Sequence, residues 1–534
     1  MTNETETLQV AAEKATARLM TLMCIDSHSN THGCVDREFW AYRTTRGFSS
    51  APFQHVMSGL SYLSRTSGPP EAERFHLLAV AALDFWIANR NANGSANEWY
   101  RNEQSYCATS MGLHAATEAL LQLRETMSHA EVAIRSEHLR ESEQWLHKRR
   151  NPLASNQQIA SCAGRFQLGV LLEDTQMMTR ALQSLNEITD GFNRSGYLAE
   201  YGGIDLGYLL LSIDLLSPAH QVGFTACESL VETLCDQLRS LLSVSGQLPF
   251  ELGTRGSAHM FFGGVRYFSQ HIPSARTLYE SMGFRSVDAQ VESLHSYDDR
   301  YLTTFAYSAL IRRLKWSTAS ANLTPSSHRL SVASTSPISA SRCIGGTLYV
   351  HPNFGHGLSW IGPNNQRLSH LGYVFTDRHG GRWTSLTPLD AGGESHQFVQ
   401  VSERRPLVTN EFLVRTLFAL CKIPSIARAA SWWARTRAGR PQRTTQMWLR
   451  REIVNQGDSV SIIDQIRYRG KQSGVISAIQ RFPFHSPSLM TLAIGSLSAE
   501  VFTHRFESTT EHGQLEFHWK IASSAEVEVR KSIR

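Results

Sequence analysis

The character of the sequence changes once along the chain, and this change limits the folds that are open to it. Up to about residue 316, apolar residues recur at spacings of three and four, which is typical of amphipathic helices. Beyond about residue 342, short segments rich in β-branched and aromatic residues are separated by turn residues, which is typical of antiparallel strands. We therefore predict two domains of different structural class.

The predicted helices are long and are joined by short loops that contain Gly, Asn or Pro, and no fixed-period repeat is visible. We predict a multidomain α+β protein, with an (α/α) toroid over 1–316, a linker rich in Ser, Thr and Pro over 317–341, and an antiparallel β-sandwich over 342–534. A helical insertion at about 411–439 interrupts the sandwich. Its apolar and basic residues fit a cover for a sheet edge, and they also fit a membrane-surface or partner-binding element.

The composition of the sequence indicates which partners and which cellular compartment to expect. The net charge of +5 over 534 residues, without a dense Lys/Arg block, gives no reason to expect nucleic-acid binding. The sequence has no run of about 18 apolar residues, so we expect no membrane span. Eight scattered cysteines without a C-x-x-C pair, and a start that lacks the pattern of a signal peptide, favour a reduced cytoplasmic protein. Periplasmic export by another route is the alternative.

The stretch "LAEYGGIDLGY" (198–208) holds an unusual number of groups that can do chemistry. Two glycines break the chain, and a helix is predicted to start near residue 204 or 205, with Tyr201 at its mouth and Asp205 and Tyr208 on one face. A tyrosine there can transfer protons if a cation or hydrogen-bond donors lower its pKa. The same pattern fits a simpler arrangement, in which Asp205 caps the helix and both tyrosines pack. Glu200 adds a second carboxylate.

Two further segments carry polar groups in unusual density. Asn156, Gln157 and Gln158 lie at a predicted helix start, where Asn156 fits an N-cap and the three amides together could donate to a carboxylate or an oxyanion. In "PFELGTRGSAHMFFGG", Glu251, Arg255 and His259 are spaced four apart, and the glycines among them argue against a regular helix. We therefore predict a cleft loop at 249–264.

Other candidates are less distinctive. Arg37 and Trp40 mix charge and aromatic character in a way that suits sugar stacking, although a salt-bridged first helix explains them equally. Asp298 and Asp299 fit helix caps. Histidines cluster at the start of the predicted sandwich, where His351 and His356 could reach the toroid, but no acidic partner has the spacing of a zinc site. We therefore expect neither a metal nor another cofactor.

Together these features resemble the heparinase II/III and alginate-lyase type of polysaccharide lyase. The segment 196–208, with its glycine turn, glutamate and spaced tyrosines, is similar to the segment that carries the catalytic tyrosine in those lyases, and "NQQ" at 156–158 is similar to their amide- or His-bearing helix start. The β-domain segment "HPNFGHGLSW" departs from their His-x-His-Ala-Asp pattern. The resemblance covers most of the chain as architecture.

The resemblance implies particular roles. Tyr208 or Tyr201 would transfer the proton, and Asn156 or Gln157 would neutralise the uronate carboxylate. Arg255 and His259 would be cleft groups, and a β-domain histidine, His351 or His356, would complete the site. The expected activity is β-elimination on an acidic, uronate-containing polysaccharide, and C5 epimerisation would share its first step. Two alternatives stay open. One is a glycoside hydrolase that uses pairs among Glu200, Asp205, Glu251 and Asp298, and the other is a non-catalytic glycan-binding protein of a polysaccharide biosynthesis pathway.

Overall fold

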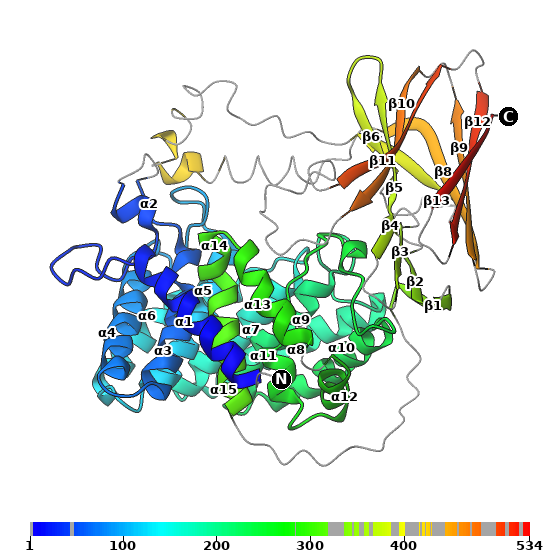
Figure 1. Ribbon diagram of the computed structural model, residues 1–534. Coiled ribbons are helices and arrows are strands. Elements are labelled where there is room, and N and C mark those ends of the chain that lie inside the picture. The colour runs from blue at the N-terminus through cyan, green and yellow to red at the C-terminus, as the bar shows by residue number, and fades with distance from the viewer. Residues whose placement is uncertain are drawn as a thin grey trace.

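The protein has a helical N-terminal part and a C-terminal part built from antiparallel sheets (Figure 1). The predicted fold class is therefore confirmed. The computed structural model describes residues 4–42, 47–282, 285–318, 336–343, 346–351, 357–362, 367–385, 395–400, 416, 419–421, 423–427, 429, 444–455, 459–469, 473–481, 498–507, 512–522 and 527–533.

The helical part is a closed ring within a second layer of helices. Each inner helix contacts the next, and the last contacts the first. The inner helices, in ring order, are α3 (Val56–Thr66), α5 (Tyr106–Leu123), α7 (Ser155–Leu171), α9 (Leu206–His220), α11 (Gly263–Phe268) and α15 (Tyr307–Thr318). Their outer partners are α4 (Glu71–Ala88), α6 (His129–His147), α8 (Thr175–Ser195), α10 (Glu228–Ser240), α12 (Pro273–Met282) and α1 (Glu4–Leu22). This arrangement is an (α/α) toroid.

The remaining helical segments complete the ring or lie at its mouth. Helix α13 (Arg285–Ser296) packs on α1, and a π-helical turn, η4 (Leu302–Ala306), leads into α15. The short segments are α2 (Arg37–Trp40), η1 (Ala51–His55), η2 (Thr225–Cys227), η3 (Phe250–Leu252) and α14 (Asp299–Tyr301).

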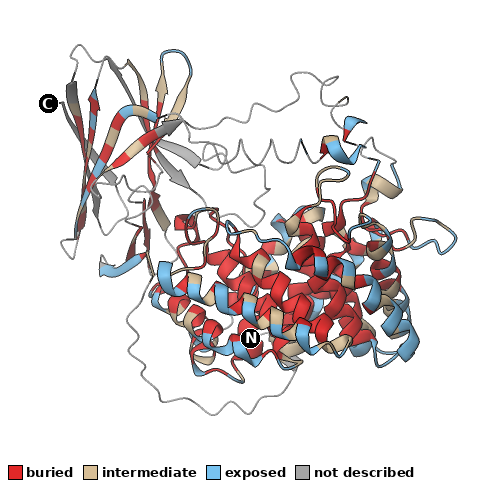
Figure 2. Ribbon diagram, turned by 180° about the vertical axis from the view of Figure 1, so that it is seen from behind, coloured by how far each residue is buried: buried red, intermediate tan, exposed pale blue. Residues whose placement is uncertain are grey.

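Burial follows the predicted hydrophobic patterns. All residues of α9 are buried, because its apolar run "LGYLLLSIDLL" occupies the inner layer on every side. Outer helices are amphipathic: α8 buries only the face that carries Met177 and Leu185. Figure 2 shows the same division, with buried residues inside the helical part and exposed residues along its outer edge. Local signals set the boundaries, as in the capping box of Ser128 and Glu131 at the start of α6.

A buried ion network joins three inner helices. Arg312 of α15 donates to Glu118 of α5 at 2.9 Å and to Asp214 of α9. All three side chains are at most 4% exposed. Removing one partner would leave a buried charge without compensation, which makes such a network costly to break. The network therefore fixes the spacing of α5, α9 and α15 around the ring.

The C-terminal part contains two antiparallel sheets within the described residues. The smaller has the strand order β1-β2-β3-β4, and the larger has the order β11-β10-β5-β6-β7-β8-β9-β12-β13. The strands are β1 (Ser339–Cys343), β2 (Gly346–His351), β3 (Gly357–Ile361), β4 (Arg367–His370), β5 (Gly372–Asp377), β6 (Arg382–Thr384), β7 (His396–Gln400), β8 (Thr444–Asn455), β9 (Ser459–Arg469), β10 (Ser473–Arg481), β11 (Ser498–Glu507), β12 (His512–Ala522) and β13 (Val527–Ile533). Leu358 and Trp360 of the smaller sheet share one core with Phe375, Ile462 and Phe517 of the larger. The sheets thus pack as a sandwich.

The smaller sheet also packs on the helical ring. Tyr349 and Ile361 belong to the same hydrophobic cluster as the helices. Glu251 of η3, which is fully buried, accepts hydrogen bonds from Ser359 of β3 and Arg367 of β4. The ring and the sheets are therefore joined by apolar contacts and by a buried ion pair.

Two details of the predicted boundaries need correction or lie outside the described residues. Strand β1 begins at Ser339, inside the predicted linker, because residues 339–343 pair with β2. Most of the predicted insertion at 411–439 lies outside the described residues. Within it, residues 424–427 are helical, and the carbonyl of Cys421 accepts a hydrogen bond from Asn102 at 3.1 Å. In the described part of the chain, no helix is long and apolar enough to cross a membrane.

Candidate active site

Several of the predicted site residues converge at one mouth of the helical ring. The start of α9, the start of α7, the loop 253–262 and the short helix α14 all meet there. The isolated bridges Ala154–Glu200 and Glu200–Gly203 hold the segment 198–205 against the start of α7. Residues that are 44 to 93 positions apart in the sequence therefore share one cluster.

Asp205 organises the backbone of this cluster. It is the N-cap of α9, where Oδ1 accepts the backbone N–H of Tyr208 at 3.2 Å. Its Oδ2 accepts the backbone N–H groups of Arg255 at 3.0 Å and Ser257 at 3.3 Å. Asp205 is fully buried, and burial raises the pKa of its carboxyl although these donors oppose the change. It therefore fixes the loop beside the helix and does not face a substrate.

Arg255 is a buried cation that lies near two aromatic rings. The side chain is 4% exposed, and its guanidinium carbon lies 4.6 Å from the ring centre of Tyr201 and 5.7 Å from that of Tyr208. Among the described residues, no carboxylate forms an ion pair with it and its Nη1 has no hydrogen-bond partner. Burial lowers the pKa of Arg255, but the phenols around it and Asp205 outweigh burial and raise it. The guanidinium is therefore charged, and no carboxylate among the described residues forms an ion pair with it.

Two hydrogen-bonded aromatic pairs lie around Tyr208. The hydroxyls of Tyr208 and Tyr301 are 3.1 Å apart, and His259 Nδ1 lies 3.1 Å from the hydroxyl of Tyr297. The ring of His259 stacks on Tyr301 at 5.2 Å and meets Tyr208 edge-on at 5.6 Å. None of these four side chains is more than 8% exposed. The stacking holds the phenols in fixed orientations.

Tyr201 lines the mouth in a strained backbone conformation. Its φ angle is +54°, which non-glycine residues rarely adopt and which persists where the surroundings impose it. Gln157 Nε2 donates to its hydroxyl at 3.3 Å, and Asn151 Nδ2 donates to Gln157 Oε1 at 2.8 Å. The side chain is half-buried. Tyr201 is thus held by an amide relay on one side and by Arg255 on the other.

Asn156 does not cap its helix, so that prediction is wrong. The N-cap of α7 is Ala154, and Asn156 lies inside the first turn. The reason is a tertiary contact: the backbone N–H and Nδ2 of Asn156 both donate to the carboxyl group of Glu200 at 2.8 Å. Glu200 is 1% exposed, and burial raises its pKa to about 8. This carboxyl therefore holds a proton at neutral pH and fixes Asn156.

Two opposing effects act on the pKa values of Tyr201 and Tyr208. Burial raises the pKa of both Tyr208 and Tyr201 above the ordinary value, while the charge of Arg255 lowers it. Burial prevails for each, so both phenols hold their protons at neutral pH. Proton abstraction by either phenol would consequently be favoured by alkaline conditions.

A second polar cluster adjoins the first along α14. Arg300 donates to Glu98 at 2.7 Å, and its guanidinium carbon lies 3.9 Å from the ring centre of Trp99. Glu103 accepts the backbone N–H groups of Glu98 and Trp99, and burial together with the charge of Glu98 raises its pKa to about 7. Burial raises the pKa of Cys107, whose thiol also feels charges of both clusters. The two clusters therefore flank the first turn of α5.

Of the other predicted residues, Asp298 borders this cluster, His356 lies outside the described residues, and the rest make different contacts. Glu251 makes the ion pair with the smaller sheet described above. Trp40 donates its indole N–H to the carbonyl of Leu22 at 2.7 Å, and Arg37 lies over the ring of Tyr42. His351 is 4% exposed at the end of β2, and His356 lies outside the described residues. Asp298 caps α14 through the backbone N–H of Tyr301 at 2.7 Å.

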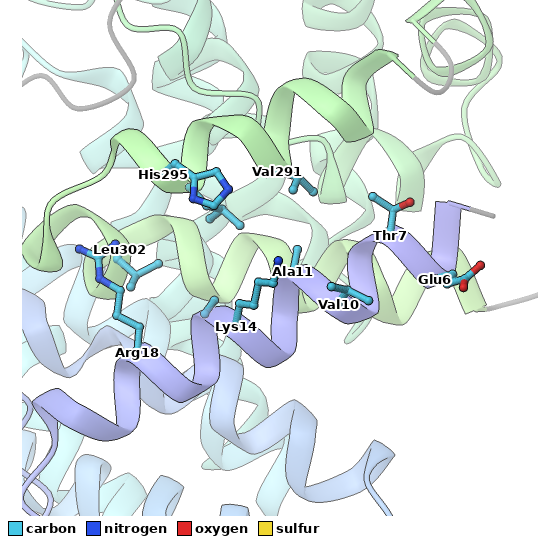
Figure 3. A pocket seen from close by; sticks show the side chains of 11 residues that line it. Glu6, Thr7, Val10, Ala11, Lys14, Arg18, Val291, His295 and Leu302 are labelled. Carbon is cyan, nitrogen blue, oxygen red and sulfur yellow. The ribbon is translucent and has the colours of Figure 1, made fainter. Parts of the chain in front are cut away.

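A cavity of about 350 Å³ lies elsewhere on the helical part (Figure 3). It lies between α1 and α13, where Val10, Val291 and Leu302 supply apolar lining and Lys14 and Arg18 also line it. It contains none of the predicted site residues. No group of His, Cys, Asp and Glu side chains among the described residues has the arrangement of a metal site.

Sequence reasoning missed Tyr297, Tyr301 and the cluster around Arg300. The stretch "HSYDDRYL" showed two tyrosines four apart beside a helix cap, which would place both on one helix face. That spacing was the available signal. In the structure Tyr297 precedes the N-cap Asp298, so the two tyrosines do not share a helix face, and the contact of Tyr301 with Tyr208 depends on closure of the ring.

Comparison with known proteins gives structural likeness without a sequence match. No family model and no curated protein matches the chain. The structure is similar to xanthan lyase of Paenibacillus, at 10% identity and a TM-score of 0.46, over 99% of this chain and 55% of the lyase. The chain thus spans about half the length of that protein.

It is also similar to chondroitin AC lyase of Streptomyces coelicolor A3 in complex with chondroitin sulphate, at 12% identity and a TM-score of 0.47. A tyrosine-to-alanine mutant of the same lyase gives 12% identity and a TM-score of 0.44. In both, the match covers 99% of this chain and 76% of the lyase. The likeness concerns the overall arrangement of the chain and leaves the chemistry to be argued from the site residues.

Proposed function

We propose that the protein is a polysaccharide lyase that cleaves a uronate-containing acidic polysaccharide by β-elimination, with Tyr208 as the proton-transfer residue. One observation carries this proposal: Arg255 is a buried guanidinium, flanked by two tyrosines, that has no anionic partner among the described residues. A buried charge without a partner is costly unless a ligand compensates it. A sugar carboxylate would supply the missing anion.

Neutralising that carboxylate is what the reaction needs first. The proton at C5 of a uronate is weakly acidic, and removing it places negative charge on the carboxylate oxygens. A planar guanidinium binds a carboxylate through two parallel hydrogen bonds and stabilises the charge that develops. Gln157, whose amide already donates to Tyr201, is a second donor at the same mouth.

Tyr208 is placed to take the proton. Its hydroxyl is hydrogen-bonded to a second phenol and its ring faces Arg255, so its phenolate would be stabilised from two sides. In the elimination, the phenolate removes the C5 proton, the electron pair forms the C4–C5 double bond, and the C4–O bond breaks. Tyr208 releases its own proton to solvent before the cycle; after the elimination it gives the C5 proton to the departing oxygen and is again the phenolate that began the step. Tyr201 also lies over the guanidinium of Arg255 and would orient it.

Hydrolysis receives less support from the same residues. Asp205 is saturated by three backbone N–H groups, Glu251 is paired with Arg367, and Asp298 caps α14. Glu200 is 1% exposed and bonded to Asn156. Paired carboxylates that flank a glycosidic bond must reach the sugar, and these four are engaged elsewhere.

The test is an elimination assay on a panel of uronate-containing polysaccharides. The growth of the ultraviolet absorbance of an unsaturated uronate measures elimination, and reducing-end release without that absorbance measures hydrolysis. We expect elimination on at least one anionic glycan. Tyr208→Phe and Arg255→Met should each reduce turnover by at least about 10²-fold, in line with the loss of a proton-transfer group or a charge-stabilising group.

Tyr307→Phe is the matched control. It also removes one hydroxyl from a fully buried tyrosine, but that hydroxyl contacts Thr16 at 3.2 Å, outside the site. Its turnover should match the unaltered protein. If the unaltered protein binds anionic glycans without forming any product, the protein is a binding protein and the proposal is overturned. Exchange of the C5 proton with solvent without chain cleavage would identify an epimerase.

A further inference from the structure

The hydroxyl of Tyr301 lies within hydrogen-bond distance of the hydroxyl of Tyr208, at 3.1 Å. Tyr301 comes from α14, 93 residues away in the sequence. The Asp298 carboxylate fixes its backbone through the N–H of Tyr301 at 2.7 Å, and its ring is stacked on His259 and Tyr297. The phenol is 8% exposed and has one fixed direction. These contacts hold it in place to act on Tyr208.

The groups around Tyr208 leave few ways to stabilise a phenolate there. Arg255 faces its ring from the loop, while Asp205 and Glu200, from the segment before α9, place acidic groups near it. His259 meets its ring edge-on and bonds instead to Tyr297. Arg255 would be shared with the substrate carboxylate once the site is filled. A separate donor to the phenolate would then be required, because burial removes water from this position.

We propose that Tyr301 is a positioning residue that donates its hydroxyl hydrogen to the phenolate of Tyr208 and so makes that residue competent to abstract a proton. The catalytic part of this role rests on the proposed function, but the hydrogen bond between Tyr301 and Tyr208 can be measured without turnover. When Tyr208 loses its proton, the shared hydrogen bond takes a single direction, from Tyr301 to Tyr208. A hydrogen bond to a charged oxygen is about twice as strong as one between neutral groups.

Tyr297 provides the matched comparison. It lies four residues before Tyr301, in the link between α13 and α14, stacks on it with ring centres 5.9 Å apart, and is also buried. Its hydroxyl is directed to His259 Nδ1 at 3.1 Å. Tyr297→Phe therefore removes a buried phenolic hydroxyl from the same cluster without removing the donor to Tyr208.

The experiment titrates Tyr208 directly. A fluorotyrosine is incorporated at position 208, and its fluorine resonance is followed against pH in the full-length protein, in Tyr301→Phe and in Tyr297→Phe. Fluorination acidifies the phenol and brings the transition into an accessible range. We expect Tyr301→Phe to raise the apparent pKa of the labelled residue by about one to two pH units. Tyr297→Phe should leave it within a few tenths of a unit. Thermal unfolding of each variant checks that the fold is retained. We expect it to be, because Phe keeps the aromatic ring and its stacking.

The inference is overturned if the labelled residue titrates at the same pH in Tyr301→Phe as in the unaltered protein. It is also overturned if Tyr297→Phe gives an equal shift, because the effect would then be general to the cluster. Where elimination is detected, the limb of the kcat profile that rises with pH should move to higher pH by the same amount in Tyr301→Phe, with KM little changed. If no elimination is detected on any glycan, the proposed function fails, while the titration still decides the role of Tyr301.

Discussion

Replacing Asp205 with alanine should separate the framework of the site from its chemistry. The carboxylate accepts three backbone N–H groups in a fully buried position, those of Tyr208, Arg255 and Ser257. Loss of the cap on α9 costs about 1 kcal/mol. The other two N–H groups would each lose a buried acceptor, at about 1–3 kcal/mol apiece. The free energy of unfolding of the helical part should therefore fall by about 3–7 kcal/mol in total.

Urea denaturation followed by helix circular dichroism measures this loss. Asp174→Ala is the matched control. Asp174 is the N-cap of α8 and accepts the N–H of Met177 at 2.9 Å, but its side chain is 25% exposed. That variant should lose about 1 kcal/mol. If Asp205→Ala is no more destabilised than Asp174→Ala, Asp205 does not hold the loop and the account of Arg255 positioning is refuted.

Two further variants test other parts of the site. Glu200 has a pKa of about 8 in the folded protein, whereas the ordinary value is 4.5. Between these two values the unfolded chain loses the proton while the folded protein keeps it, so the free energy of unfolding falls as pH rises from about 4.5 to about 8. Glu200→Gln cannot titrate, and its unfolding free energy should lack that decline in denaturation curves taken across the range; an unchanged pH dependence would contradict the burial argument. Gly207→Ala places a Cβ 2.3 Å from the carbonyl oxygen of Ser257, so it should displace the Arg255 loop and reduce elimination by at least about tenfold. Gly191→Ala, which meets only the end of the Arg194 side chain at 4.0 Å, should leave both activity and fold unaltered, and equal losses in the two variants would count against the steric argument.

Local sequence signals predicted much of the framework. The periodicity of apolar residues located α5, α7 and α9 to within a few residues, because inner and outer helices bury characteristic faces. Asp205 was recognised as a possible cap, since an acidic residue before an apolar run has few other local uses. The unusual density of polar groups around 198–208 and 251–259 also pointed to the mouth of the ring, where Tyr208, Arg255 and His259 lie.

Other assignments failed or could not be made because they depend on distant partners. Asn156 had the local pattern of an N-cap, yet its amide serves Glu200, and no local signal distinguishes the two uses. Glu251 was a candidate for the cleft, but Arg367, 116 residues away, draws it into the contact with the sheets. The pKa of each tyrosine likewise reflects burial, which the sequence alone does not fix.

The order of helices and strands, and the residue types available for chemistry, were therefore determined by the sequence alone, because periodicity, capping and turn preference act over a few residues. Only the tertiary structure decided which of those residues meet. Closure of the ring brings Tyr301 to Tyr208 and leaves Arg255 buried without an acidic partner among the described residues. Hydrogen bonds and charge effects act over a few ångströms, so their partners are set by packing and not by position along the chain.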